Sequence, residues 1–206
     1  MQKLIKEINQ LKQKPIKKTI DKRIKEFSSF QNKPINKIFN ELCFCILTAN
    51  STAERCIDVQ KKIGNGFLKL NKKQLIKKLK KLSCRFHTKR ASYIIEARKK
   101  INKLNKALKK DPEEARLWIA NNIKGLGIKE SSHFLRNIGY TDIAIIDFHI
   151  IDLLEKNNII KKPKALNEKT YLEIEEILRK TAKKAKLNLA ELDLYLWYLE
   201  TGKVLK

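Results

Sequence analysis

The stretch that decides the fold runs from Ile123 to Ile150 and reads IKGLGIKESSHFLRNIGYTDIAIIDFHI. Apolar residues recur at helical intervals on both sides of Gly125-Leu126-Gly127, which predicts two helices joined by a tight turn. The chain has only six glycines, so two of them one residue apart mark a turn that a side chain would obstruct. Such a turn lets backbone N–H groups approach an anion, and the following helix adds its positive N-terminal end.

Two residues with useful chemistry stand at fixed places around this turn. Lys129 follows Gly127 by two residues, and Asp147 comes eighteen residues after Lys129. A lysine acts as a nucleophile near neutral pH only when its pKa falls from about 10.4 toward roughly 7–8. The start of a helix, with Lys124 nearby, disfavours a positive charge at Lys129. Taken singly, a solvated lysine and a helix-capping aspartate explain these two residues.

The composition indicates a folded protein with a polyanionic partner. Lysine and arginine outnumber acids 47 to 22, which gives a formal charge of +25, and 42% of the residues are apolar. A nucleic-acid phosphate is the obvious anion for this charge, and ribosomal binding is an alternative on charge alone. No run of about 18 apolar residues suggests a membrane span, and the N-terminus MQKLIKEINQLKQK is charged. We expect a cytoplasmic protein without a membrane partner.

The rest of the chain has the apolar period of helices, and no stretch alternates as a strand would, so we predict an all-α fold. Asp111, followed by Pro112 and two acids, has the pattern of a helix N-cap. Asp147 can cap another helix, and Gly139 is expected to stop the one before it. Helices are predicted near residues 4–14, 38–50, 52–63, 71–82, 88–109, 112–123, 128–137, 148–155, 168–186 and 189–200.

The four cysteines do not have the spacing of a metal site. Cys43 and Cys45 lie two residues apart inside the apolar run LCFCILTA, and Cys56 and Cys84 are isolated. Common zinc sites use pairs separated by two residues, so we expect no metal. Buried reduced cysteines behave as small hydrophobic residues, and we predict that role for all four.

The central stretch resembles a family. Ile123 to Lys129 resembles the helix–hairpin–helix signature of the base-excision DNA glycosylases, and Ile146-Asp147-Phe148-His149 resembles the aspartate motif that follows it. The resemblance implies a helix–hairpin–helix at about 113–138, within a single glycosylase domain, 1–206, of two helical lobes with DNA bound between them. It also implies that Lys129 is the nucleophile, with Asp147 as its proton acceptor and electrostatic partner. DNA contacts are expected from Lys124, Gly125, Gly127 and His149.

Three further segments resemble the compact archaeal-type 8-oxoguanine DNA glycosylase/lyases. They are LCFCILTAN ending at Asn50, Arg85-Phe86, and the C-terminal run LDLYLWYLETGKVLK that ends at Lys206. The similarity extends from about Asp21 to Lys206 and implies a prokaryotic, nucleoid-associated monomer that acts on double-stranded DNA containing oxidised guanine. No cysteine follows Cys84, so the iron–sulfur cluster of endonuclease III-like relatives is not expected.

The same resemblance assigns residues to a pocket for a base rotated out of the duplex. Phe86 and Trp197 are candidates to sandwich the base, although ordinary core packing is the alternative for both. Asp193 lies one helical turn before Trp197 and could accept hydrogen bonds from the purine N–H groups. Lys206 is a further candidate at the base, and Asn50 is a candidate to enter the gap that the base leaves.

Two other functions fit the same residues. A glycosylase/lyase for oxidised pyrimidines would use the same lysine and differ only in its base pocket. A non-catalytic hairpin protein would bind nucleic acid through phosphates alone and would cleave nothing. No cofactor is expected in any of these cases, and a monovalent cation at the hairpin carbonyls is left open.

Overall fold

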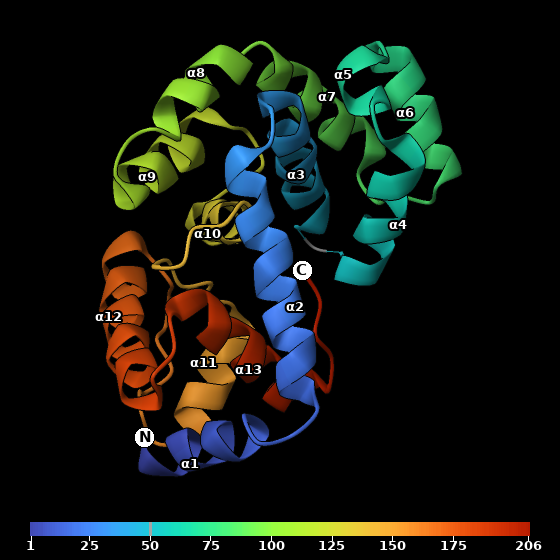
Figure 1. Ribbon diagram of the computed structural model, residues 1–206. Helices are drawn as coiled ribbons and strands as arrows, with labels where there is room; N and C mark the ends of the chain where they lie inside the picture. The colour runs from blue at the N-terminus through green and yellow to red at the C-terminus, as the bar shows by residue number, and fades with distance from the viewer. Residues whose placement is uncertain (50) are drawn as a thin grey trace. The chain divides into compact units, whose positions relative to one another are not determined.

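The computed structural model describes residues 1–49 and 51–206, and all regular structure within these residues is helical (Figure 1). The all-α prediction is therefore confirmed. No helix in the described ranges is long and apolar enough to cross a membrane. The helices are α1 Gln2–Leu11, α2 Ile16–Ser28, α3 Ile35–Thr48, α4 Ala53–Ile63, α5 Gly66–Lys69, α6 Lys72–Lys81, α7 His87–Arg98, α8 Ile101–Ala107, α9 Pro112–Asn122, α10 Ile128–Asn137, α11 Phe148–Lys156, α12 Glu168–Ala185 and α13 Leu189–Thr201, with a 3₁₀ turn at Ser29–Asn32.

Side-chain caps begin the helices where the sequence predicts them. The Asp111 carboxylate accepts a hydrogen bond of 2.9 Å from the Glu113 N–H and begins α9. The Asp147 carboxylate accepts one of 3.1 Å from the Ile150 N–H and begins α11. Each cap satisfies a backbone donor that the first turn of a helix leaves without an intrahelical partner.

The prediction of one helix over 88–109 is wrong, because the chain forms α7 and α8 there. At the junction, the Lys99 and Lys100 N–H groups bond the carbonyls three residues earlier, which is the tighter pattern of a 3₁₀ turn. The Lys100 amine also donates to the carbonyl of Asn122 at the end of α9. Since α7 packs on α6 while α8 packs on α9, tertiary contacts divide a continuous apolar pattern.

The chain forms two compact units, which we call unit 1, Met1–Ser29 with Gly139–Lys206, and unit 2, Phe30–Ile138. The centre of unit 2 is α3, which packs against α4, α7 and α10 and is buried from Leu42 to Thr48. All four cysteines are buried and not in disulfides, and burial raises the pKa of the Cys43 and Cys56 thiols. Their burial confirms the prediction that they pack as small hydrophobic residues.

Unit 1 is built around α13, which contacts α2, α11 and α12. The N-terminal helix α1 packs on α12 and α13 through the buried side chains of Leu4, Ile8 and Leu11. The Lys12 amine donates a 2.8 Å hydrogen bond to the carbonyl of Ala185, where α12 ends. The first residues of the chain are therefore an integral part of this unit.

Candidate DNA-processing site

The hairpin between α9 and α10 requires glycine at its first position. Gly125 has φ +87°, and a Cβ there would lie 2.6 Å from Cδ2 of the Tyr93 ring. Both the left-handed backbone and the close approach of this ring exclude a larger residue. Leu126 is only 4% exposed and anchors the turn, while Gly125 and Gly127 are exposed on either side of it.

Gly127 differs from Gly125, because its φ of −90° is open to any residue. Its N–H donates a 3.3 Å hydrogen bond to Oε2 of Glu130, which is one half of a capping box at the start of α10, since glycine has no side chain to make the other half. The other oxygen of this carboxylate lies 3.9 Å from the Lys129 amine. The Glu130 carboxylate thus accepts the hydrogen bond of a hairpin N–H next to Lys129. The Lys129 side chain is 31% exposed.

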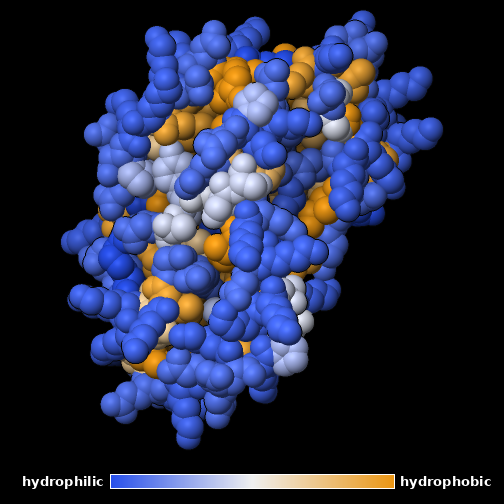
Figure 2. Space-filling model, viewed as in Figure 1, coloured by the Kyte–Doolittle hydropathy of each residue, from blue (hydrophilic) through white to orange (hydrophobic). Residues whose placement is uncertain are grey.

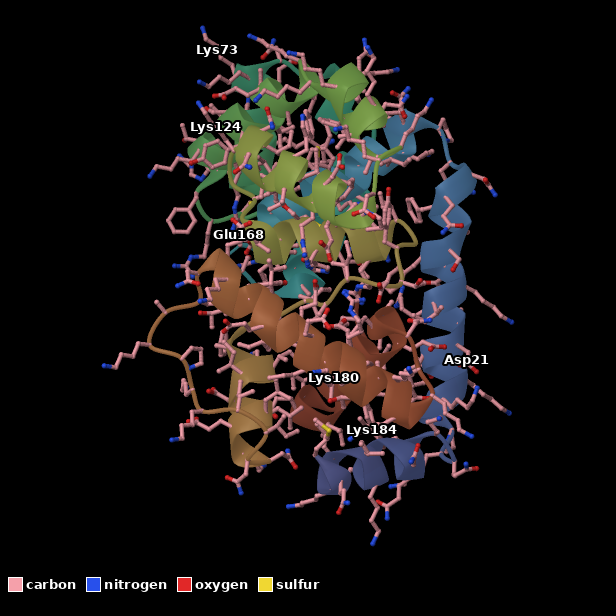
Figure 3. The ribbon with its side chains drawn as sticks, turned by 90° about the vertical axis from the view of Figure 1, so that its left-hand side faces the viewer. Asp21, Lys73, Lys124, Glu168, Lys180 and Lys184 are labelled. Atoms are coloured by element: carbon pink, nitrogen blue, oxygen red, sulfur yellow. The ribbon has the colours of Figure 1, made fainter. Side chains whose placement is uncertain are left out.

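Lys124 points outward from the same turn, as Figure 3 shows. Its amine lies 3.0 Å from the Glu96 carboxylate, and the two side chains are 64% and 43% exposed. An ion pair with this much solvent contributes little to stability. The Lys124 amine can therefore exchange this partner for another anion at small cost.

Asp147 stands at the end of a tightly held segment in unit 1. The Tyr171 hydroxyl accepts a 3.1 Å hydrogen bond from the Ile146 N–H and donates one of 2.8 Å to the Ala144 carbonyl. The buried Glu175 carboxylate accepts a 2.8 Å bond from the Ala144 N–H. These bonds from α12 fix the backbone that precedes Asp147, whose side chain is partly exposed at the start of α11.

An aromatic group continues from Asp147 along α11. The His149 ring meets the Trp197 ring edge-on at 5.1 Å between centroids, and the Phe148 ring lies 4.0 Å from His149. Phe148 is 64% exposed, because the buried face of α11 is formed by Ile150 and the apolar residues that follow it. Phe148 was not predicted to have a role of its own. Its position before the apolar face of the helix was the available signal that it is exposed.

The remaining pocket candidates of unit 1 lie on or after α13. Asp193 is partly buried and lines a small cavity together with Ile145, Ile150 and Leu196. Trp197 is also partly buried, so it is not simply a core residue, and Lys206 is partly buried at the last position. Within this unit, the structure thus brings His149 and Trp197 into contact.

Phe86 belongs to unit 2 and is held in the open. It is 52% exposed and has φ +54°, so the alternative of core packing for this residue is wrong. The guanidinium groups of Arg85 and Arg90 lie 5.3 and 5.8 Å from its ring centroid. Arg90 is only 3% exposed and is fixed by a 3.2 Å bond to the Cys84 sulfur and by a bond to the Ala49 carbonyl. Asn50 lies outside the described residues.

The candidate residues are divided between the two units. Unit 2 holds the hairpin and the predicted nucleophile, and unit 1 holds the predicted carboxylate and most of the base pocket. In the part of the chain that the structure describes, no three His, Cys, Asp or Glu side chains form a group that could bind a metal ion. In unit 2 the residues are Phe86, Lys124, Gly125, Gly127 and Lys129, and in unit 1 they are Asp147, His149, Asp193, Trp197 and Lys206.

Comparisons with known proteins agree over nearly the whole chain. The model of the 8-oxoguanine DNA glycosylase family matches residues 20–187. A Methanocaldococcus jannaschii 8-oxoguanine DNA glycosylase/AP lyase is 55% identical over 98% of this chain and 99% of its own length. A relative of the same name from Korarchaeum cryptofilum is 44% identical over 98% of both chains.

Solved structures show the same fold. The Methanocaldococcus jannaschii 8-oxoguanine glycosylase/lyase, crystallised with 15mer DNA containing 8-oxoguanine, aligns with a TM-score of 0.95 at 54% identity, over 98% of this chain and 99% of that one. The 8-oxoguanine DNA glycosylase of Thermotoga maritima aligns with a TM-score of 0.93 at 42% identity, over 100% and 99%. By sequence and by structure, the chain belongs to the 8-oxoguanine DNA glycosylase family.

Proposed function

We propose that this chain is a bifunctional base-excision repair enzyme that removes 8-oxoguanine from double-stranded DNA and then cleaves the strand. The observation that carries the proposal is the full-length similarity, at 55% identity, to a protein named 8-oxoguanine DNA glycosylase/AP lyase. The hairpin, Lys129 and Asp147 supply the groups that both reactions need.

Lys129 is the proposed nucleophile. Its unprotonated amine attacks C1′ of the deoxyribose, and the N-glycosidic bond breaks with its electron pair leaving on the base. Opening of the sugar ring converts the adduct to a Schiff base, and loss of a C2′ proton then expels the 3′-phosphate by β-elimination. Asp147 accepts the amine proton and stabilises the positive charge that develops on the sugar.

The phosphates and the base use the other residues. The exposed hairpin glycines and Lys124 bind the DNA backbone, and His149 contacts it from α11. Phe86 and Trp197 offer aromatic faces to the displaced base. Asp193 offers an acceptor, and Lys206 is a further candidate for contact with the base. The exposed Phe148 joins these residues as a proposed contact to a nucleotide next to the lesion.

All steps of this chemistry use side chains of the protein, so we propose that it requires no organic cofactor. We also propose that the protein is a monomer and acts in the cytoplasm. The hairpin carbonyls are the place where a monovalent cation would bind. An experiment with potassium replaced by tetramethylammonium would detect such a cation as a loss of DNA affinity at constant ionic strength.

The test of the function compares three duplexes that contain 8-oxoguanine, thymine glycol or only normal bases at one position. Base release and strand cleavage are measured separately under single-turnover conditions. We expect both products from the 8-oxoguanine duplex, and Lys180→Gln, which changes an exposed lysine of α12 with no proposed role in the site, is the control that should retain the reaction. Products from thymine glycol alone would establish the pyrimidine alternative, and tight binding without any product would establish the non-catalytic one.

A further inference from the structure

A long segment of unit 2 carries no acidic residue. From Val59 to Ile95 the chain has 37 residues with twelve lysines and arginines and no aspartate or glutamate. At the average of the whole chain, 22 acids in 206 residues, about four would be expected there. The segment contains the end of α4, α5, α6 and most of α7, and hydrophilic side chains cover most of this region in Figure 2.

Four of the six lysines of α6 lie on one side of the helix. Leu75 and Leu79 are buried and attach α6 to unit 2, while Lys73, Lys77, Lys80 and Lys81 are exposed. These lysines follow one another at intervals of i, i+4, i+7 and i+8, so they share the face opposite the leucines. We call these four residues the lysine face. Figure 3 labels Lys73 on it.

The lysine face has no anionic partner of its own. Among the described residues, none of its four amines makes a hydrogen bond or an ion pair. Three exposed lysines elsewhere, in contrast, are paired with acids four residues away, in Lys17–Asp21, Lys62–Asp58 and Lys110–Glu114. A helix that keeps lysines at i, i+4 without one acid accepts like-charge repulsion. A bound polyanion would remove that repulsion.

We propose that the lysine face of α6 binds the phosphate backbone of duplex DNA outside the nucleotide that is processed. Residues 73–80 extend about 10 Å along the helix axis, and this matches roughly three phosphates of one strand at 3.4 Å of rise each. The helix also leads directly into the segment that carries Arg85 and the exposed Phe86. The proposal rests on the proposed function only in that the polyanion is DNA.

The test compares two triple variants that remove the same charge. Lys73→Gln/Lys77→Gln/Lys80→Gln changes the lysine face, and Lys180→Gln/Lys183→Gln/Lys184→Gln changes exposed lysines of α12, two of which Figure 3 labels. Binding of an undamaged 30-base-pair duplex is measured by fluorescence anisotropy between about 50 and 200 mM salt. We expect the slope of log K against log salt to fall by about 2–3 for the α6 variant, at about 0.9 for each lost phosphate contact, and by less than 1 for the control.

Several outcomes would overturn the proposal. One is an unchanged slope for the α6 variant. The other is an equal fall of the slope in both variants, which would show an effect of total charge alone. A variant with arginine at the same three positions should restore the slope, which guards against misfolding of the glutamine variant. Strand cleavage at saturating enzyme should remain within about twofold of the unaltered protein. If the unaltered protein cleaves nothing, the proposed function fails, while the slope comparison still decides the role of α6.

Discussion

Asp147 has two roles in this account, and one pair of substitutions separates them. Its carboxylate caps α11 through the 3.1 Å hydrogen bond from the Ile150 N–H, and it is the proposed partner of Lys129 on the sugar. Asparagine can accept the same hydrogen bond without a charge. Loss of a cap costs about 1 kcal/mol, so Asp147→Ala should lower the melting temperature by roughly 2–4 °C. Asp147→Asn should have a free energy of unfolding within about 0.5 kcal/mol of that of the unaltered protein.

The effect on the reaction should be the same for both variants, because both remove the charge. Loss of one preorganised electrostatic group typically slows a reaction by about 100–1,000-fold. We expect that loss in the single-turnover rate of 8-oxoguanine release. Asn167→Ala is the control, since Asn167 caps α12 with a 2.9 Å bond from the Thr170 N–H and has no proposed role in the reaction. It should lower stability in the same way and leave the rate unchanged.

Base release by Asp147→Asn within about threefold of the unaltered rate would refute the role of the Asp147 charge in the reaction. Asp147 would then be a helix cap and nothing more. Equal destabilisation by asparagine and alanine would instead show that the capping bond is not what the Asp147 side chain contributes to stability.

Three further predictions concern the hairpin, the core and the aromatic group. Gly125→Ala should lower the free energy of unfolding, measured in urea, by roughly 2–4 kcal/mol, because alanine disfavours the left-handed backbone and its Cβ would clash with the Tyr93 ring. Gly202→Ala, with φ +70° and no atom within 4 Å of the new Cβ, should cost only the backbone share of roughly 1–2 kcal/mol. Burial, with two nearby carboxylates, raises the pKa of Tyr195 to about 12, so the folded state holds its proton longer and stability should fall as pH rises from about 10 to 12. Tyr195→Phe should remove that part of the pH dependence, and an unchanged profile would contradict it. Phe148→Ala should leave stability within about 0.5 kcal/mol and weaken DNA binding roughly fivefold or more, and equal affinity would exclude the proposed contact.

The parts of the fold that could be predicted are those with local causes. Asp111 and Asp147 cap helices because their side chains bond backbone donors two or three residues away, so the start of each helix is written in the sequence. The boundaries of α10 were predicted correctly from its hairpin glycine and Gly139. The break between α7 and α8 was not, because it depends on α6 and α9, which hold the two parts from different sides. The helix α2 was also missed, although Ile16, Ile20, Ile24 and Phe27 recur at helical intervals and were an available signal.

The site shows the same division. The spacing of hairpin, lysine and aspartate was visible because it follows the chain, and the structure bears out the turn and the cap. The exposure of Phe86 could not be predicted, since its position depends on the buried Arg90 and its bonds to Cys84 and Ala49. The bond of the Glu130 carboxylate to the Gly127 N–H could have been predicted from the glutamate at the third position of α10.

The central claim is that Lys129 attacks the sugar of an 8-oxoguanine nucleotide, and borohydride trapping tests it most directly. Borohydride reduces a Schiff base to a stable amine, so a covalent protein–DNA adduct reports the intermediate itself. We predict an adduct with a duplex containing one 8-oxoguanine for the unaltered protein and for the control Lys180→Gln, and none for Lys129→Gln. An adduct of equal yield with Lys129→Gln, or none from the unaltered protein even with an abasic site, would contradict the account.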